Sequence, residues 1–325
     1  MTDMRHAPPR KPFPPPSTTV GDEDGPEFSY ADPADPLVKQ WAIKAIEQVT
    51  GQPRLKRLYM ENWREPFPGE WFFEAAVRKL ELKLNLNWDR LMRIPATGPV
   101  VIVSNHPYGV LDGIIVCYLI SRVRDDFKVL TNSVLSRAEE VRPYILPVDF
   151  AETDEALRTN LKTRQEAQKL LANDGCIVVF PGGGVGTAEK VLKWQVKMIE
   201  PEWKPFTARM IMATRATVVP MFFEGRNSRL FQFASKVSVT FRLSLFFNEV
   251  ANKIGAAMDI QVGEPIPYAQ LEHIKDRRAL MDRLRQITLA LGSPFARHPK
   301  RPQRRRLSLL RGLPSKSGLK RPGPR

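Results

Sequence analysis

Short apolar runs alternate with amphipathic stretches along the middle of the chain. Buried strands are predicted where four to seven mostly apolar residues lie between turn signals, and helices where apolar residues recur every three or four positions. The predicted strands are 100–104, 127–130, 176–180, 217–223 and 259–262. The predicted helices are 114–120, 134–141, 155–171, 206–215 and 269–291, and residues 229–257 favour helix over strand. This alternation predicts an α/β fold, a mostly parallel sheet flanked by helices.

The two ends of the chain differ from this middle part. Residues 1–36 hold nine prolines, and residues 293–325 are rich in Pro and Arg. Both segments are predicted to be disordered, because they cannot bury enough apolar surface to offset the entropy of ordering. Between them we expect a helical extension over 37–95 and an α/β domain over 96–292. Two helices are expected in the extension. One begins after Pro36 and ends at a break at 51–53, and the other covers 70–82.

The charge of the chain is concentrated near its end. The formal net charge is +15, from 50 Lys and Arg against 35 Asp and Glu. Residues 297–325 hold eleven Lys and Arg and no acidic residue, about three quarters of that excess. A basic tail of this kind indicates a polyanionic partner such as a membrane surface or a nucleic acid.

Several protein classes are disfavoured by the same composition. The longest apolar run is Ile114–Ile120, seven residues, whereas a bilayer-spanning helix needs about 20. The first residues contain no apolar stretch typical of a signal peptide. The two cysteines, Cys117 and Cys176, both lie in apolar runs, so neither a disulfide framework nor a zinc site is expected. We therefore expect a cytoplasmic protein.

One of the four histidines stands where chemistry is expected. His106 directly follows a buried strand, and parallel sheets usually bind ligands beyond the carboxyl ends of their strands. Asp112 comes six residues later, where its carboxylate would hold one imidazole nitrogen while the other takes a proton from a substrate hydroxyl. A loop whose polar groups satisfy one another explains the pair equally well. No Ser or Cys nucleophile can be paired with His106, so a catalytic pair would activate a bound substrate.

The segment SNHPYGVLDG (104–113) resembles the His–Asp block of the glycerophospholipid and lysophospholipid acyltransferases, in the NHPxGxLDG variant of a bacterial haemolysin-like branch. Three further segments resemble the other blocks of that family in order and spacing: RPYILPVDF (142–150), FPGGGVGTAE (180–189) and VVPMFFEGRNSRLF (218–231). The similarity covers roughly residues 37–292. It implies O-acyl transfer from acyl-CoA or acyl-carrier protein to a free lysolipid hydroxyl. His106 would be the general base, Asp112 would orient it, and neither metal nor organic cofactor is required.

The third block departs from the family pattern. The usual form is F-P-E-G-T-R-S, whose Glu and Arg are implicated in binding the acceptor phosphate, and here Gly182 and Val185 stand in their places. This departure disfavours lysophosphatidic acid and makes lyso-ornithine lipid, which has no phosphate, an alternative acceptor. Gly182, Gly183 and Gly184 are candidates to present backbone N–H groups to an anion. A tight turn from a strand into a helix explains the same glycines.

The fourth block supplies further candidates for substrate binding. Arg226, Asn227 and Arg229 follow a buried strand, where Arg side chains suit phosphate or carboxylate groups. Glu224 is a candidate to line the same pocket, and Arg142, in the second block, is another candidate for the headgroup. An ordinary polar loop explains these residues as well.

A lipid acceptor requires contact with a membrane. We expect peripheral docking on the inner face of the cell membrane, through the aromatic residues of 230–247, through 71–73, or through the basic tail. Two other classes compete with the enzyme: a catalytically inactive lipid- or acyl-binding protein, and a nucleic-acid-binding protein. The intact His106 and Asp112 favour the enzyme, and no nucleic-acid-binding module is recognisable, so no nucleic-acid partner is expected.

Overall fold

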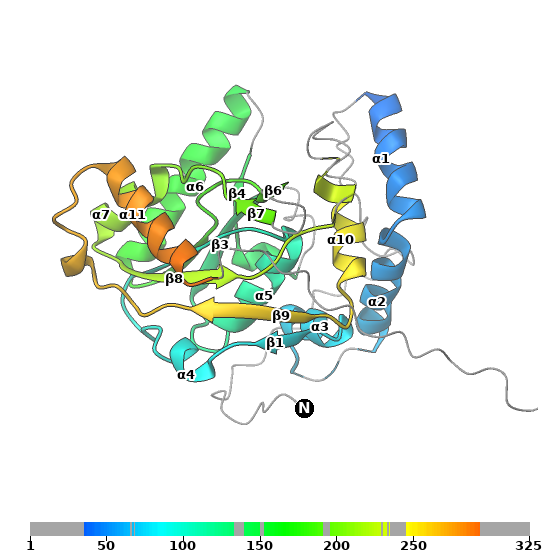
Figure 1. The fold of residues 1–325 in the computed structure, drawn as a ribbon, viewed down its shortest axis with the longest axis horizontal. Helices are drawn as coiled ribbons and strands as arrows, with labels where there is room; N and C mark the ends of the chain where they lie inside the picture. Colours follow the sequence, from blue (N-terminus) through cyan, green and yellow to red (C-terminus); the bar gives the residue numbers. More distant parts are fainter. Residues whose placement is uncertain are drawn as a thin grey trace, which may run out of the picture.

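The computed structural model describes residues 36–65, 67, 69–132, 140–149, 153–190, 196–228, 230–232, 234 and 245–292. Within these ranges, seven strands form one sheet in the order β1-β9-β8-β2-β5-β3-β4 (Figure 1). The strands are β1 (Lys83–Asn85), β2 (Val100–Ser104), β3 (Phe127–Asn132), β4 (Ile145–Val148), β5 (Cys176–Val179), β8 (Thr217–Phe223) and β9 (Ala257–Val262). All neighbours pair in parallel except β8 and β9. The predicted α/β fold with a mostly parallel sheet is confirmed.

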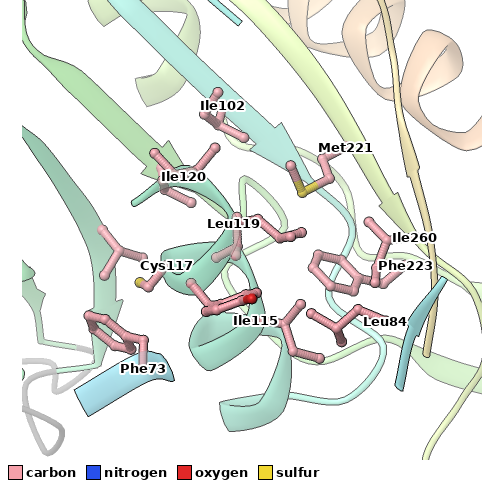
Figure 2. Close-up of a cluster of buried hydrophobic side chains, with 14 of the residues drawn as sticks. Phe73, Leu84, Ile102, Ile115, Cys117, Leu119, Ile120, Met221, Phe223 and Ile260 are labelled. Atoms are coloured by element: carbon pink, nitrogen blue, oxygen red, sulfur yellow. The ribbon is translucent and has the colours of Figure 1, made fainter. Parts of the chain in front are cut away.

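Helices cover both faces of the sheet because side chains alternate across each strand. One core contains Ile102 of β2 together with α3 (Phe72–Lys79) and α5 (Val110–Ile120) (Figure 2). The opposite core contains Val101 and Val103 of the same strand. Its helices are α6 (Asp154–Ala172), α7 (Phe206–Thr214) and α11 (Arg277–Ala290). All five residues of β2 are buried, so this strand lies at the centre of the domain.

The segment expected as a helical extension also adds a strand to the sheet. Helix α1 (Leu37–Val49) is followed by α2 (Gln52–Arg64), where the sequence predicted only a break. Pro53 stands in the first turn of α2, a position that tolerates proline. Helix α3 ends at Lys79 because Glu81 adopts a φ of 52°, after which the chain forms β1 and the short α4 (Trp88–Leu91). In Figure 1, α1 and α2 stand beside α10 (Phe246–Asn252), and α10 contacts α2.

The remaining predicted elements agree in place but differ at their ends. Strands 100–104 and 217–223 and helix 155–171 are confirmed to within a residue. The helix expected over 269–291 is divided into the 3-10 turn η3 (Tyr268–Gln270) and α11, which begins where the Asp276 side chain accepts the Ala279 N–H at 2.7 Å. The region 229–257, where helix is favoured over strand, includes the helix α10 in its described part.

The glycine turn after β5 leads into strands, not into a helix. β6 (Thr187–Lys190) pairs antiparallel with β7 (Val196–Ile199). The residues 184–187, Gly-Val-Gly-Thr, are poor helix formers, so the alternative of a tight turn from a strand into a helix does not hold. The helix expected over 134–141 falls mostly outside the described residues, which resume before the 3-10 turn η2 (Arg142–Tyr144). Both tails and most of 230–247 lie outside them as well. In the described ranges, no helix is long and apolar enough to cross a bilayer.

Candidate active site

His106 stands just beyond the carboxyl end of β2, the central strand. The preceding residue, Asn105, ties this end to the neighbouring strand: its Nδ2 donates to the Phe223 carbonyl at 2.9 Å, and its Oδ1 accepts the Phe223 N–H at 2.7 Å. The His106 carbonyl accepts the N–H of Gly186 at 2.8 Å. The backbone around His106 is therefore held both by β8 and by the segment after the glycine turn.

The structure brings His106 and Asp112 together. Asp112 lies in the first turn of α5 and is fully buried, and its Oδ2 lies 3.1 Å from Nδ1 of His106. The same oxygen accepts the backbone N–H groups of Tyr108 at 2.8 Å and Gly109 at 3.0 Å. Burial raises the pKa of the Asp112 carboxyl, whereas His106 and the two N–H donors lower it. The turn between strand and helix thus aims one carboxylate oxygen at the imidazole.

An aromatic ring stacks on the imidazole of His106. The ring of Phe180 stacks on that of His106 with centroids 4.0 Å apart and an interplanar angle of 25°. The His106 side chain remains 18% exposed, while its Nδ1 is enclosed next to Asp112. Nε2, the other ring nitrogen, is therefore not occupied by Asp112, which a general base acting on a substrate hydroxyl would require.

The glycine turn lies next to this loop because β5 pairs with β2. Gly183 adopts a φ of +66°, a conformation that favours glycine. A Cβ atom on Gly183 would lie 3.3 Å from Nζ of Lys204, so an ammonium group stands over the turn. The structure therefore places Gly182, Gly183 and Gly184 beside His106 and adds a cation that the sequence analysis did not single out.

Glu200, which follows β7, is a buried carboxyl at the same place. Its Oε2 accepts the His106 N–H at 3.4 Å, and a Cβ atom on Gly182 would lie 3.3 Å from its Oε1. The pKa of Glu200 is raised to about 7, chiefly by burial and to a lesser extent by Asp112, although His106 and the Trp203 side chain lower it. Glu200 is not recognisable from the sequence, because it belongs to no motif and lies 94 residues from His106.

The fourth block contributes to the site in a different way from the one expected. Asn227 is buried, donates from Nδ2 to the Tyr108 carbonyl at 3.4 Å and accepts from Nζ of Lys253 at 3.3 Å, so its amide holds the loop together. Arg226 is half-buried beside it, and Arg229 lies outside the described residues. The Glu224 carbonyl accepts the Tyr108 hydroxyl at 2.7 Å.

Arg142 does not join the site. It is exposed and precedes β4, the edge strand, three strands away from β2. Because β2 and β4 run in the same direction, Arg142 lies toward the amino ends of the strands, whereas His106 follows a carboxyl end. The structure therefore does not bring Arg142, a candidate for the headgroup, next to His106. Among the described residues, no group of three His, Cys, Asp or Glu side chains is placed to hold a metal ion.

Comparison with known proteins identifies the family. Residues 40–295 match the sequence pattern of the acyltransferase family. Two relatives are each named lyso-glycine lipid O-acyltransferase. The protein from Phocaeicola vulgatus is 24% identical over 248 residues, which cover 73% of this chain and 83% of the relative. The protein from Bacteroides thetaiotaomicron is 24% identical over 249 residues, which cover 73% of this chain and 85% of the relative.

A solved structure covers a similar part of the chain. The crystal structure of the 1-acyl-sn-glycerophosphate acyltransferase PlsC from Thermotoga maritima is 14% identical, with a TM-score of 0.43, over 77% of this chain and 78% of its own. The family pattern itself spans well over half of the 325 residues. The chain therefore belongs to the acyltransferase family and is an acyltransferase.

Proposed function

We propose that this acyltransferase moves a fatty acyl group from a thioester to the free hydroxyl of a lysolipid, with His106 as general base. Nε2 takes the hydroxyl proton while the oxygen attacks the thioester carbonyl carbon. The tetrahedral oxyanion then collapses, the carbon–sulfur bond breaks, and the thiolate takes the proton back from the imidazolium. The observation that carries this proposal is the 3.1 Å approach of a fully buried Asp112 carboxylate to Nδ1, which leaves Nε2 to the substrate.

The proposal is tested with purified protein and a thioester donor. General-base catalysis typically contributes about 10²- to 10⁴-fold, so His106→Ala should lower kcat by at least about 10²-fold. Asp112→Asn should also lower kcat, because the amide cannot stabilise the imidazolium as the carboxylate does. Full turnover by a folded His106→Ala protein would overturn the assignment of the base.

The acceptor is proposed to be a lysolipid with an anionic headgroup. The two relatives are named for lyso-glycine lipid, and a glycine joined to a lipid through its nitrogen presents a free carboxylate. The Gly183 N–H donates to the Phe180 carbonyl at 3.0 Å, so the turn would bind such an anion through the N–H groups of Gly182 and Gly184. The Lys204 ammonium above Gly183 would add a cation. Arg226, which follows β8, is proposed to add a second cation.

Competing acceptors are separated by one panel. Lyso-glycine lipid, lyso-ornithine lipid, lysophosphatidic acid and lysophosphatidylcholine are offered at equal concentrations. Preference for lyso-glycine lipid, and a raised KM for this lipid in Lys204→Gln, would support binding of a headgroup carboxylate. Preference for lyso-ornithine lipid would support the alternative acceptor. Equal use of lysophosphatidic acid would contradict a phosphate-free acceptor.

The donor and the site of action complete the proposal. Acyl-CoA and acyl-carrier protein both carry the acyl group as a thioester, and a comparison of the two donors at equal acyl-chain length distinguishes them. A cytoplasmic enzyme that reaches lipid must dock on an anionic membrane face, and the basic residues of 297–325 suit that contact.

A further inference from the structure

A buried ion pair lies next to Tyr108, two residues after His106. Nζ of Lys253, directly after α10, lies 3.2 Å from Oε2 of Glu249 in the same helix. The two side chains are only 6% and 1% exposed. Removing both charges from water is costly, so such a pair persists only where further partners satisfy it.

Both members of the pair have these partners. The Lys253 ammonium donates to Oδ1 of Asn227 at 3.3 Å and lies 4.8 Å from the centre of the Tyr108 ring. The Glu249 carboxylate accepts the N–H of Ser228 at 2.8 Å and the Ser228 hydroxyl. Burial lowers the pKa of Lys253, whereas the negative charges of Glu249 and Asp112 raise it. The attraction to Asp112 links this group electrostatically to the active site.

A continuous set of contacts runs from the ion pair to the base. Asn227 accepts from Lys253 and donates to the Tyr108 carbonyl at 3.4 Å. The Tyr108 N–H donates to Oδ2 of Asp112 at 2.8 Å, and this oxygen lies 3.1 Å from Nδ1 of His106. Tyr108 is thus held at its carbonyl and its ring by the ion-pair side, and its N–H aims the Asp112 carboxylate.

From this arrangement we infer that Lys253, paired with Glu249, is a positioning residue for acyl transfer: it fixes Tyr108 through Asn227 and so holds Asp112 against His106. The inference rests on the proposed role of His106 as the base. A misplacement of about 1 Å in a catalytic group costs about 10²-fold in rate, so a loosened Tyr108 should be visible in kcat.

The competing view is that the ion pair only stabilises the fold, and the chain offers a matched control. Arg124 is another buried cation, paired with Asp126 at 2.6 Å. It donates to the carbonyls of Pro95 at 3.0 Å and Gly98 at 2.8 Å. These residues precede β2, at the end of the strand opposite His106. Arg124→Met therefore loses a buried cation without disturbing the His106 loop.

The first experiment compares kcat, KM and melting temperature in three full-length proteins: wild type, Lys253→Met and Arg124→Met, at a temperature where all are folded. We expect Lys253→Met to lower kcat by about 10- to 100-fold with KM changed less than about threefold. Arg124→Met should lower the melting temperature and leave kcat unchanged. A folded Lys253→Met with wild-type kcat would overturn the inference, as would an equal kcat loss in Arg124→Met.

A second variant keeps the test decisive if Lys253→Met does not fold. Asn227→Ala removes the link between Lys253 and Tyr108 without leaving a charge unpaired. We expect a lower kcat at nearly constant KM. A folded Asn227→Ala with wild-type kcat and KM would also overturn the inference. A raised KM with unchanged kcat would mean that Asn227 contacts the headgroup and would overturn the inference. If His106→Ala retains turnover, the proposed function fails, independently of this result.

Discussion

The buried carboxyl of Glu200 predicts an unusual dependence of stability on pH. Its pKa is raised from an ordinary value of 4.5 to about 7, chiefly because burial disfavours the charged form. Between these two values the folded protein keeps the proton that the unfolded chain has released. The free energy of unfolding should therefore fall as pH rises from 4.5 to about 7. Above about pH 7 this group should cause no further change.

The size of the effect follows from the shift. One pKa unit corresponds to about 1.4 kcal/mol, so a shift from 4.5 to about 7 amounts to about 3 kcal/mol. Glu200→Gln removes the titration but keeps the shape and an oxygen that accepts the His106 N–H, whose distance to Oε2 is 3.4 Å. The free energy of unfolding of the variant relative to wild type should thus rise by about 3 kcal/mol between pH 4.5 and pH 8.

The assay is urea unfolding of wild type and Glu200→Gln at intervals of half a pH unit, monitored by tryptophan fluorescence. Taking the difference between the two proteins cancels the titration of groups that they share. The change in that difference should be concentrated between pH 4.5 and 7. A difference that is independent of pH would refute the reasoning, because Glu200 would then titrate alike in the folded and unfolded chains.

Three further perturbations test other parts of the structure. Gly109→Ala should destabilise the protein by about 2–4 kcal/mol in denaturant unfolding, because Gly109 has a φ of +82° and the new Cβ would lie 2.5 Å from Cε1 of Phe246; an unchanged unfolding midpoint would contradict the packing described. Arg124→Met should cost about 3 kcal/mol by the same method, since charged hydrogen bonds to the carbonyls of Pro95 and Gly98 are lost. Deletion of 297–325, which carries eleven basic residues, should weaken binding to anionic vesicles at low salt more than turnover on detergent-solubilised substrate; equal vesicle binding by both chains would rule out the tail as an anchor.

The elements that sequence reasoning located well are those with strong local signals. β2 and β8 are uninterrupted apolar runs, and α6 begins at a Thr153 side chain that accepts the Ala156 N–H at 3.2 Å. Such signals depend only on neighbours along the chain. The elements that were not predicted from the sequence have weak local signals. β1 has three residues, and the first turn of α2 contains Pro53, which the sequence pattern indicates as a break.

The same division holds within the active site. His106 and Asp112 were found together because a strand, a turn and a helix start bring residues six apart within 3.1 Å. Arg142 lies apart from His106, and similarity of a block alone does not say at which end of a strand a residue lies.

Local patterns along this chain determine the α/β class, the order of its main strands and helices, and the His106–Asp112 pair, since these features need only neighbouring residues. Folding alone brings Glu200 to the backbone of His106 and Lys253 to the ring of Tyr108, because these contacts join segments 94 and 145 residues apart. Their unusual acidity or basicity arises from burial, and burial depends on which side chains the sheet and its helices pack around each group.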